Sequence, residues 1–217
     1  MRNLTISAVR AAALSWIAVM RRSTLSKRLL PHRLGITLAN LPRQTPYLLA
    51  PTDGILPPAP PGHLKLGLAW SGNRLHQVNE RRSLALAELE PVLRLPGVTF
   101  YSLQVDVPPR DESNLGRFPN LVDLRPRLRD FQDTAAMVAQ LDLVLTVDTA
   151  VAHLAGALAR PTWTLLAQAA DWRWLLDRTD TPWYPTMRLF RQTEPGDWRP
   201  VVATLAAELI KLGGWPA

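Results

Sequence analysis

The chain has 217 residues, long enough to bury a sizeable core, and its 47% hydrophobic and 20% charged content is ordinary for a globular protein. It contains no cysteine, which excludes a disulfide framework, a thiolate nucleophile and a cysteine-based zinc site. The net charge of +7 raises the question of a nucleic-acid partner.

The positive charge is concentrated at the N-terminus. Residues 1–65 carry nine of the 25 Lys and Arg side chains but only one of the 18 acidic ones, Asp53. The remaining residues carry 16 basic and 17 acidic side chains and are nearly neutral, so a nucleic-acid partner is not favoured. The basic extension, residues 1–40, fits either contact with RNA or anionic lipid or a solvated, partly disordered leader. The second interpretation is the simpler one.

No membrane span is expected. Residues 11–20 form an apolar stretch of ten residues, whereas a helix that crosses a bilayer needs about 20. Arg21 and Arg22 follow that stretch directly and no small-x-small cleavage site is evident, which disfavours a signal peptide. The expected location is cytoplasmic.

A proline-rich segment precedes the regular part of the chain. Residues 41–63 contain seven prolines and two glycines, which exclude a helix or a central strand. We expect a linker or wrapping segment here, followed by one domain over residues 64–212.

That domain alternates strands and helices with short connections. Strands are expected at residues 64–70, 98–103, 121–124, 142–147, 162–166 and 187–191, and helices at 87–95, 131–141, 148–159 and 197–212. Such alternation is typical of an α/β, doubly wound parallel sheet. Ligands of these sheets bind at the carboxyl ends of the strands, near the point where strand order reverses.

The strongest local signal follows the strand that ends at Val147. Asp148, Thr149 and Ala150 begin a helix whose first turn is small, so its free amides and dipole suit a phosphate. His153 lies four residues after Thr149 and therefore on the same helical face. The structural alternative is that Asp148 is an ordinary N-cap and His153 an ordinary helix residue.

A second polar cluster follows the first strand. Ser71, Gly72 and Asn73 can form a tight turn that exposes amide donors to an oxyanion, with His76 close behind. Arg81 and Arg82 could contact a diphosphate. The alternative is a surface turn with solvated arginines.

Two weaker signals lie in other loops. Gln104 ends the second strand and could read a base edge or a sugar hydroxyl. Residues 171–174, Asp-Trp-Arg-Trp, suggest a lid near the site, although core packing is the commoner role of tryptophan.

Other chemistries lack their motifs. The chain has no G-x-G-x-x-G, no P-loop, no G-x-S-x-G elbow and no D-x-D pair, and its four His residues show no zinc spacing. No cofactor or metal is expected.

These motifs resemble those of bacterial heptosyltransferase-like glycosyltransferases. The resemblance covers roughly residues 31–212 and is strongest among members fused to tetratricopeptide repeats. It is carried by residues 68–73 with His76, Arg82-Ser83, 102–104, 147–156 and 171–174. Asn73 is followed by Arg74, where the family commonly has proline.

The resemblance implies the C-terminal, donor-binding half of a two-domain GT-B fold. Asp148, Thr149 and Ala150 would face the diphosphate of a nucleotide sugar, with His153 nearby, and Ser71, Gly72, Asn73 and His76 would line the opposite wall. Transfer would be inverting and metal-independent. The N-terminal half that would carry the catalytic base is not recognised: residues 31–50 resemble its tail, and residues 1–30 resemble nothing in it. A separate N-terminal GT-B half or a repeat protein is therefore an expected partner.

Two other functions stay open. The chain could be a truncated, non-catalytic remnant that at most binds nucleotide. It could also be a basic-tailed binder of RNA or membrane surfaces, whose binding would depend steeply on salt.

Overall fold

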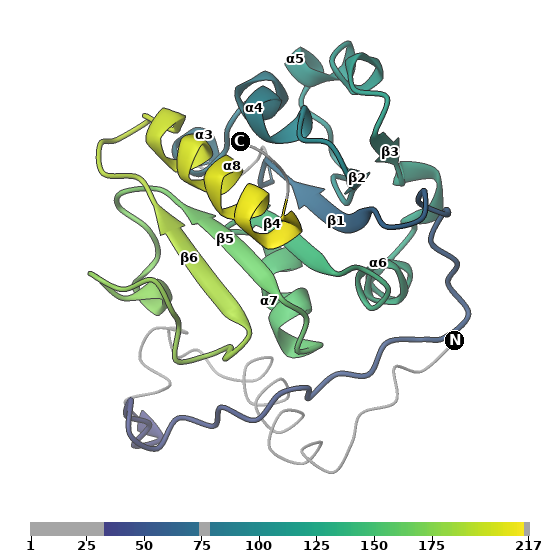
Figure 1. The fold of residues 1–217 in the computed structure, drawn as a ribbon. Coiled ribbons are helices and arrows are strands. Elements are labelled where there is room, and N and C mark those ends of the chain that lie inside the picture. The colour runs from purple at the N-terminus through teal and green to yellow at the C-terminus, as the bar shows by residue number, and fades with distance from the viewer. Residues whose placement is uncertain (1–32, 74–78, 215–217) are drawn as a thin grey trace.

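The computed structural model describes residues 33–73 and 79–214. Its centre is one six-stranded sheet in which every pair of neighbouring strands is parallel, in the order β3-β2-β1-β4-β5-β6 (Figure 1). The strands are β1 (Leu64–Ala69), β2 (Val98–Ser102), β3 (Leu121–Asp123), β4 (Leu143–Val147), β5 (Thr162–Leu166) and β6 (Met187–Arg191). The order reverses between β1 and β4, which confirms the predicted doubly wound, Rossmann-like α/β fold.

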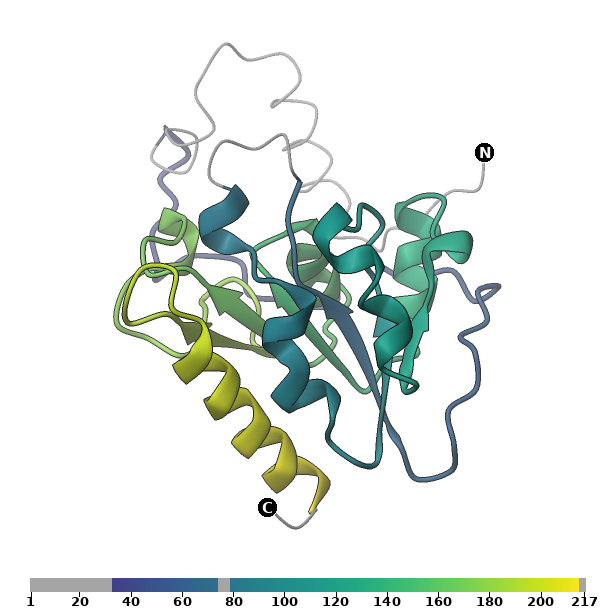
Figure 2. The same cartoon turned by 90° about the horizontal axis from the view of Figure 1, so that it is seen from above.

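Helices cover both faces of the sheet, as Figures 1 and 2 show together. On one face lie α4 (Glu90–Leu93) and α8 (Arg199–Gly213), and on the other lie α6 (Phe131–Val138) and α7 (Ala150–Ala157). The shorter elements are α3 (Asn79–Arg82), α5 (Pro109–Glu112), η1 (Leu86–Leu89), η2 (Leu115–Arg117), η3 (Arg125–Arg127) and η4 (Trp172–Trp174).

The elements agree with the sequence pattern except in short segments. β5 and β6 have the predicted bounds, because each is a mostly buried run that begins just after a proline, Pro161 or Pro185. The helix predicted at 87–95 is instead a 3₁₀ turn followed by one α-helical turn, with Pro91 at its start. α3 and α5, each of four residues, were not predicted, since one turn has no measurable periodicity.

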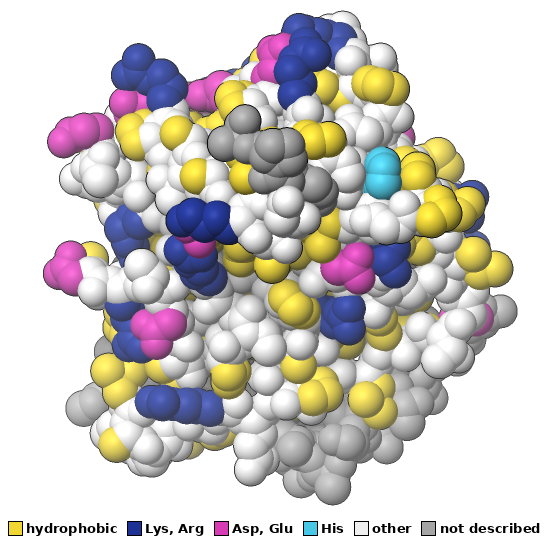
Figure 3. Space-filling view, in the orientation of Figure 1, with side chains coloured by type: hydrophobic (Ala, Val, Ile, Leu, Met, Phe, Trp, Pro, Cys, Tyr) yellow, Lys and Arg dark blue, Asp and Glu magenta, His cyan; other side chains and the backbone are white. Residues whose placement is uncertain are grey.

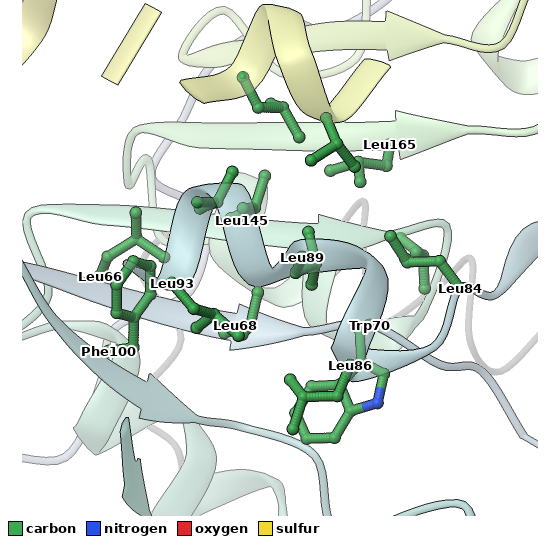
Figure 4. Packing of buried hydrophobic residues seen from close by; sticks show 14 of the residues in the cluster. Leu66, Leu68, Trp70, Leu84, Leu86, Leu89, Leu93, Phe100, Leu145 and Leu165 are labelled. Atoms are coloured by element: carbon green, nitrogen blue, oxygen red, sulfur yellow. The ribbon is translucent and has the colours of Figure 1, made fainter. Parts of the chain in front are cut away.

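The larger core lies between the sheet and helices α4 and α8. Leu66, Leu68 and Trp70 alternate along β1 and its end, and all three point to this face (Figure 4). They meet the buried leucines of η1 and α4, Leu86, Leu89 and Leu93, together with Leu145, Leu165 and Leu205. Removal of such surface from water is the main driving force for the fold.

The proline-rich segment wraps around the other face. The backbone amides of Tyr47 and Leu48 both donate to the carbonyl of Ala157, at the end of α7. Farther along, the Gln140 amide group donates to the carbonyl of Gly54 and accepts from the amide of Leu56. The segment follows the edge of the domain in Figure 1. The bounds predicted for extension, linker and domain stay predictions.

Basic and acidic side chains are interspersed on the face over α8 (Figure 3). Glu208 on α8, for example, pairs with both Arg188 and Lys211. Among the described residues, this face carries no continuous basic patch of the kind that tracks a nucleic-acid backbone. Within residues 33–73 and 79–214, no helix has the length and hydropathy to cross a membrane.

Candidate functional site

A cleft of about 810 Å³ opens at the carboxyl ends of β1, β2 and β4. This is the point where the strand order reverses, the usual ligand site of such sheets. Of the ten predicted site residues, His76 lies outside the described residues. The other nine all line the cleft: Ser71, Gly72, Asn73, Arg82, Gln104, Asp148, Thr149, Ala150 and His153. Segments up to 82 residues apart in sequence thus share one surface.

Helix α7 begins two residues later than the pattern indicates. Thr149, not Asp148, is the N-cap: its hydroxyl accepts from the amide of Val151 at 3.3 Å and lies 3.1 Å from the hydroxyl of Thr146. The carbonyl of Thr149 accepts from the amide of Ala152. Thr149 can be the N-cap because its backbone is extended. Asp148 therefore does not cap the helix, and it lines the cleft.

The expected tight turn at residues 71–73 does not form, and the segment has no regular secondary structure. The Ser71 amide donates to Gln104 Oε1 at 3.0 Å, and the Gly72 amide donates to Ser83 Oγ at 3.0 Å. These two donors are therefore not available to an oxyanion, which corrects the sequence-based prediction.

Gln104 has a bracing role that sequence alone did not reveal. Its Oε1 accepts from the amides of Trp70 and Ser71, and its Nε2 donates to the carbonyls of Ser71 and Asp106. The side chain is 6% exposed. With both ends engaged, the amide ties the end of β2 to the end of β1.

Three arginines, Arg82, Arg129 and Arg173, line the cleft. Arg82 donates from Nη1 to the carbonyl of Asp148 at 3.0 Å, and its Nε has no hydrogen-bond partner among the described residues. Its guanidinium lies against Gly72, where an added Cβ would come within 2.7 Å of Nη2. Arg173, paired with Asp171 at 3.0 Å, lines the same cleft. These guanidinium groups can contact an anion, and three aspartates, Asp106, Asp130 and Asp148, line the same cleft.

His153 sits among aromatic rings at the edge of the cleft. Its ring is stacked on Trp174, with centroids 5.3 Å apart and planes 14° apart, and its Nδ1 lies 3.0 Å from the Tyr184 hydroxyl. Trp174 is fully buried and Trp172 is 44% exposed, while Arg173 lines the cleft; the lid suggested by the sequence for residues 171–174 stays a prediction.

The ionisation of His153 predicts a pH effect on stability. Burial, followed by the charge of Arg173, lowers the pKa of His153, against the opposing charges of Asp148 and Asp171. The unfolded chain therefore binds the proton more readily, so this contribution to stability is fully present above about pH 6.5 and is lost as pH falls below it. We expect thermal unfolding midpoints to fall from pH 7 to pH 5, with a shallower decline in His153→Gln. Equal slopes would contradict this account.

Several residues of the cleft were missed in the sequence. Phe131, which the sequence placed only at the start of a helix, is 58% exposed and lines the cleft. Val105, 57% exposed, and Arg129 also line it. Phe131 begins α6, and a first-turn residue can project beyond the sheet while keeping the helical period. No sequence signal marked Val105 or Arg129.

Comparisons with known proteins agree with this picture. Residues 112–183 match the model of glycosyltransferase family 9 (heptosyltransferase). Protein FlbA of Caulobacter vibrioides is 33% identical over 152 residues, covering 67% of this chain and 25% of that protein. The chain thus spans about a quarter of the length of this curated relative.

Solved structures give further matches. The E. coli ADP-heptose LPS heptosyltransferase II matches with a TM-score of 0.50 and 15% identity, over 71% of this chain and 47% of that one. The E. coli heptosyltransferase WaaC with ADP-2-deoxy-2-fluoro heptose matches with a TM-score of 0.48 and 18% identity, over 84% of this chain and 54% of that one.

The predicted heptosyltransferase-like resemblance is confirmed. The family match includes residues 147–156 and 171–174, two of the motifs that suggested it. The structural match to heptosyltransferase II shows a shared fold, and about half of that enzyme has no counterpart here.

Proposed function

We propose that this chain is a donor-binding domain of a glycosyltransferase, which holds a nucleotide-diphosphate sugar in the cleft between β1 and β4. The observation that carries the proposal is the position of α7: its first residue, Ala150, its N-cap, Thr149, and the preceding Asp148 line the cleft where the strand order reverses. The family 9 match supports the same reaction class.

The electrostatics of the cleft suit a diphosphate. Transfer of a sugar from a nucleotide diphosphate leaves negative charge on the departing phosphate, and that charge must be stabilised in the transition state. The guanidinium groups of Arg82 and Arg173 line the cleft and would stabilise this charge. With these cations in place, we propose a metal-independent, inverting transfer.

The catalytic base belongs, in this proposal, to a partner half. An acceptor hydroxyl must lose its proton during transfer, and a carboxylate or imidazole within hydrogen-bond reach would take it. We propose that a second Rossmann-like half, on another chain or a longer form of this one, supplies that base and the acceptor groove in a GT-B arrangement.

Calorimetric titration with ADP, UDP and their sugar conjugates tests the donor site. We expect Asp148→Ala combined with His153→Ala to weaken binding at least tenfold, because both side chains line the cleft at the start of α7. A tenfold loss corresponds to about 1.4 kcal/mol.

The matched control is Asp142→Ala combined with His63→Ala. These residues lie at the amino ends of β4 and β1, the opposite edge of the sheet, where Asp142 accepts from the Lys65 amide and His63 contacts Thr99. This variant should bind like the wild type. Unchanged affinity in the first double variant would reject the placement, and no binding to the wild type would reject the donor function.

A further inference from the structure

Three side chains from distant parts of the sequence form a hydrogen-bonded chain behind the cleft. The Tyr184 hydroxyl lies 3.0 Å from His153 Nδ1 and 3.4 Å from the Tyr47 hydroxyl. His153 belongs to α7, Tyr184 precedes β6 and Tyr47 belongs to the wrapping segment. Because Nδ1 is engaged by Tyr184, Nε2 is the ring nitrogen that remains for a ligand in the cleft.

The geometry of this chain is tightly constrained. A Cβ added at Gly156 would lie 2.4 Å from Cγ of Tyr184, so the tyrosine ring rests directly on the backbone of α7. Tyr184 is only 8% exposed. Trp174 stacks on His153, and the backbone amide of Tyr47 donates a hydrogen bond to the carbonyl of Ala157. These contacts fix the backbone and rings that carry His153 Nδ1 and the hydroxyls of Tyr184 and Tyr47, and so hold the three atoms together.

Chemistry favours one direction for the hydrogens. An imidazole nitrogen is a much stronger base than a phenol oxygen, which favours donation from the Tyr184 O–H to Nδ1 and leaves the Tyr184 oxygen to accept from the Tyr47 hydroxyl. Burial raises the pKa of Tyr184, which keeps this hydroxyl protonated. Burial and Arg173 lower the pKa of His153 against Asp148 and Asp171, which favours a neutral ring.

We propose that Tyr184 is a positioning residue that holds His153 as the neutral tautomer with hydrogen on Nε2, ready to donate to a phosphate oxygen of the nucleotide. The opposite tautomer would present a lone pair to that oxygen and repel it. The identity of the ligand rests on the proposed function, whereas the tautomer is a property of the protein alone.

Long-range ¹H–¹⁵N correlation spectra of ¹⁵N-labelled, ligand-free full chain test the tautomer directly. His153→Gln assigns the signals. At neutral pH we expect Nδ1 to be unprotonated and Nε2 to be protonated in the wild type, and a mixture of tautomers in Tyr184→Phe. A proton on Nδ1 in the wild type, or an unchanged tautomer in Tyr184→Phe, would overturn the proposal.

Tyr101→Phe is the matched control. Tyr101 is a buried tyrosine whose hydroxyl donates to the carbonyl of Pro57 at 2.7 Å, so this variant loses a comparable hydrogen bond. It should keep the His153 tautomer. A tautomer change in Tyr101→Phe equal to that in Tyr184→Phe would count against a specific role of Tyr184.

Titration with ADP and UDP completes the test. Loss of one net hydrogen bond predicts about three- to tenfold weaker binding in Tyr184→Phe, and none in Tyr101→Phe. Wild-type affinity in Tyr184→Phe would overturn the proposed role in binding. If the wild type binds neither nucleotide, the donor function fails, and the spectra still decide whether Tyr184 sets the tautomer.

Discussion

Replacement of Asp111 by alanine is expected to lower the free energy of unfolding by about 2–6 kcal/mol, because two buried donors lose their acceptor at about 1–3 kcal/mol each. The Asp111 carboxylate is 1% exposed and accepts from the Trp70 indole nitrogen at 2.9 Å and from the Leu86 amide at 3.0 Å. Both donors belong to the larger core (Figure 4).

Urea denaturation of Asp111→Ala measures this loss, with Glu112→Ala as the control. Glu112 is the next residue, but its side chain is 48% exposed and it pairs with Arg125 at the surface. Such pairs contribute about 0–1 kcal/mol, so the control should remain close to the wild type. Equal losses in the two variants would contradict the role of Asp111 as the acceptor for these two buried donors. Because Trp70 leads into residues 71–73, we also expect Asp111→Ala to weaken nucleotide binding.

Replacement of Gly156 by alanine is the second substitution with a large expected effect. The new Cβ would overlap the ring of Tyr184, with three ring atoms within 2.9 Å, so the ring must move. Overpacking of this kind costs about 1–3 kcal/mol. Movement of the ring also removes the hydroxyl from His153 Nδ1, so the tautomer and any nucleotide affinity should change together.

Gly116→Ala is the control for Gly156→Ala, since no atom lies within 4 Å of a Cβ added at Gly116. That variant should be neutral or slightly stabilised through the smaller entropy of its unfolded chain. Urea denaturation compares the two free energies of unfolding. A Gly156→Ala protein as stable as Gly116→Ala would mean that Tyr184 is not held against α7.

The sequence by itself determined the order of the six strands and the longer helices, the parallel sheet and the edge of the sheet that holds the cleft. These features depend on local signals: buried runs such as residues 143–147, breakers such as Pro161, and a small first turn after Val147. Each signal acts between residues close in the chain, so a pattern can record it.

Only the tertiary structure decided which polar atoms of the site residues are held by other protein groups and which are left for a ligand in the cleft. The amides of Ser71 and Gly72 are taken by Gln104 and Ser83, which lie 33 and 11 residues away. His153 meets Tyr184 across 31 residues, and Tyr184 meets Tyr47 across 137. Hydrogen-bond partners this distant are chosen by how helices and strands pack, and no local spacing records that choice.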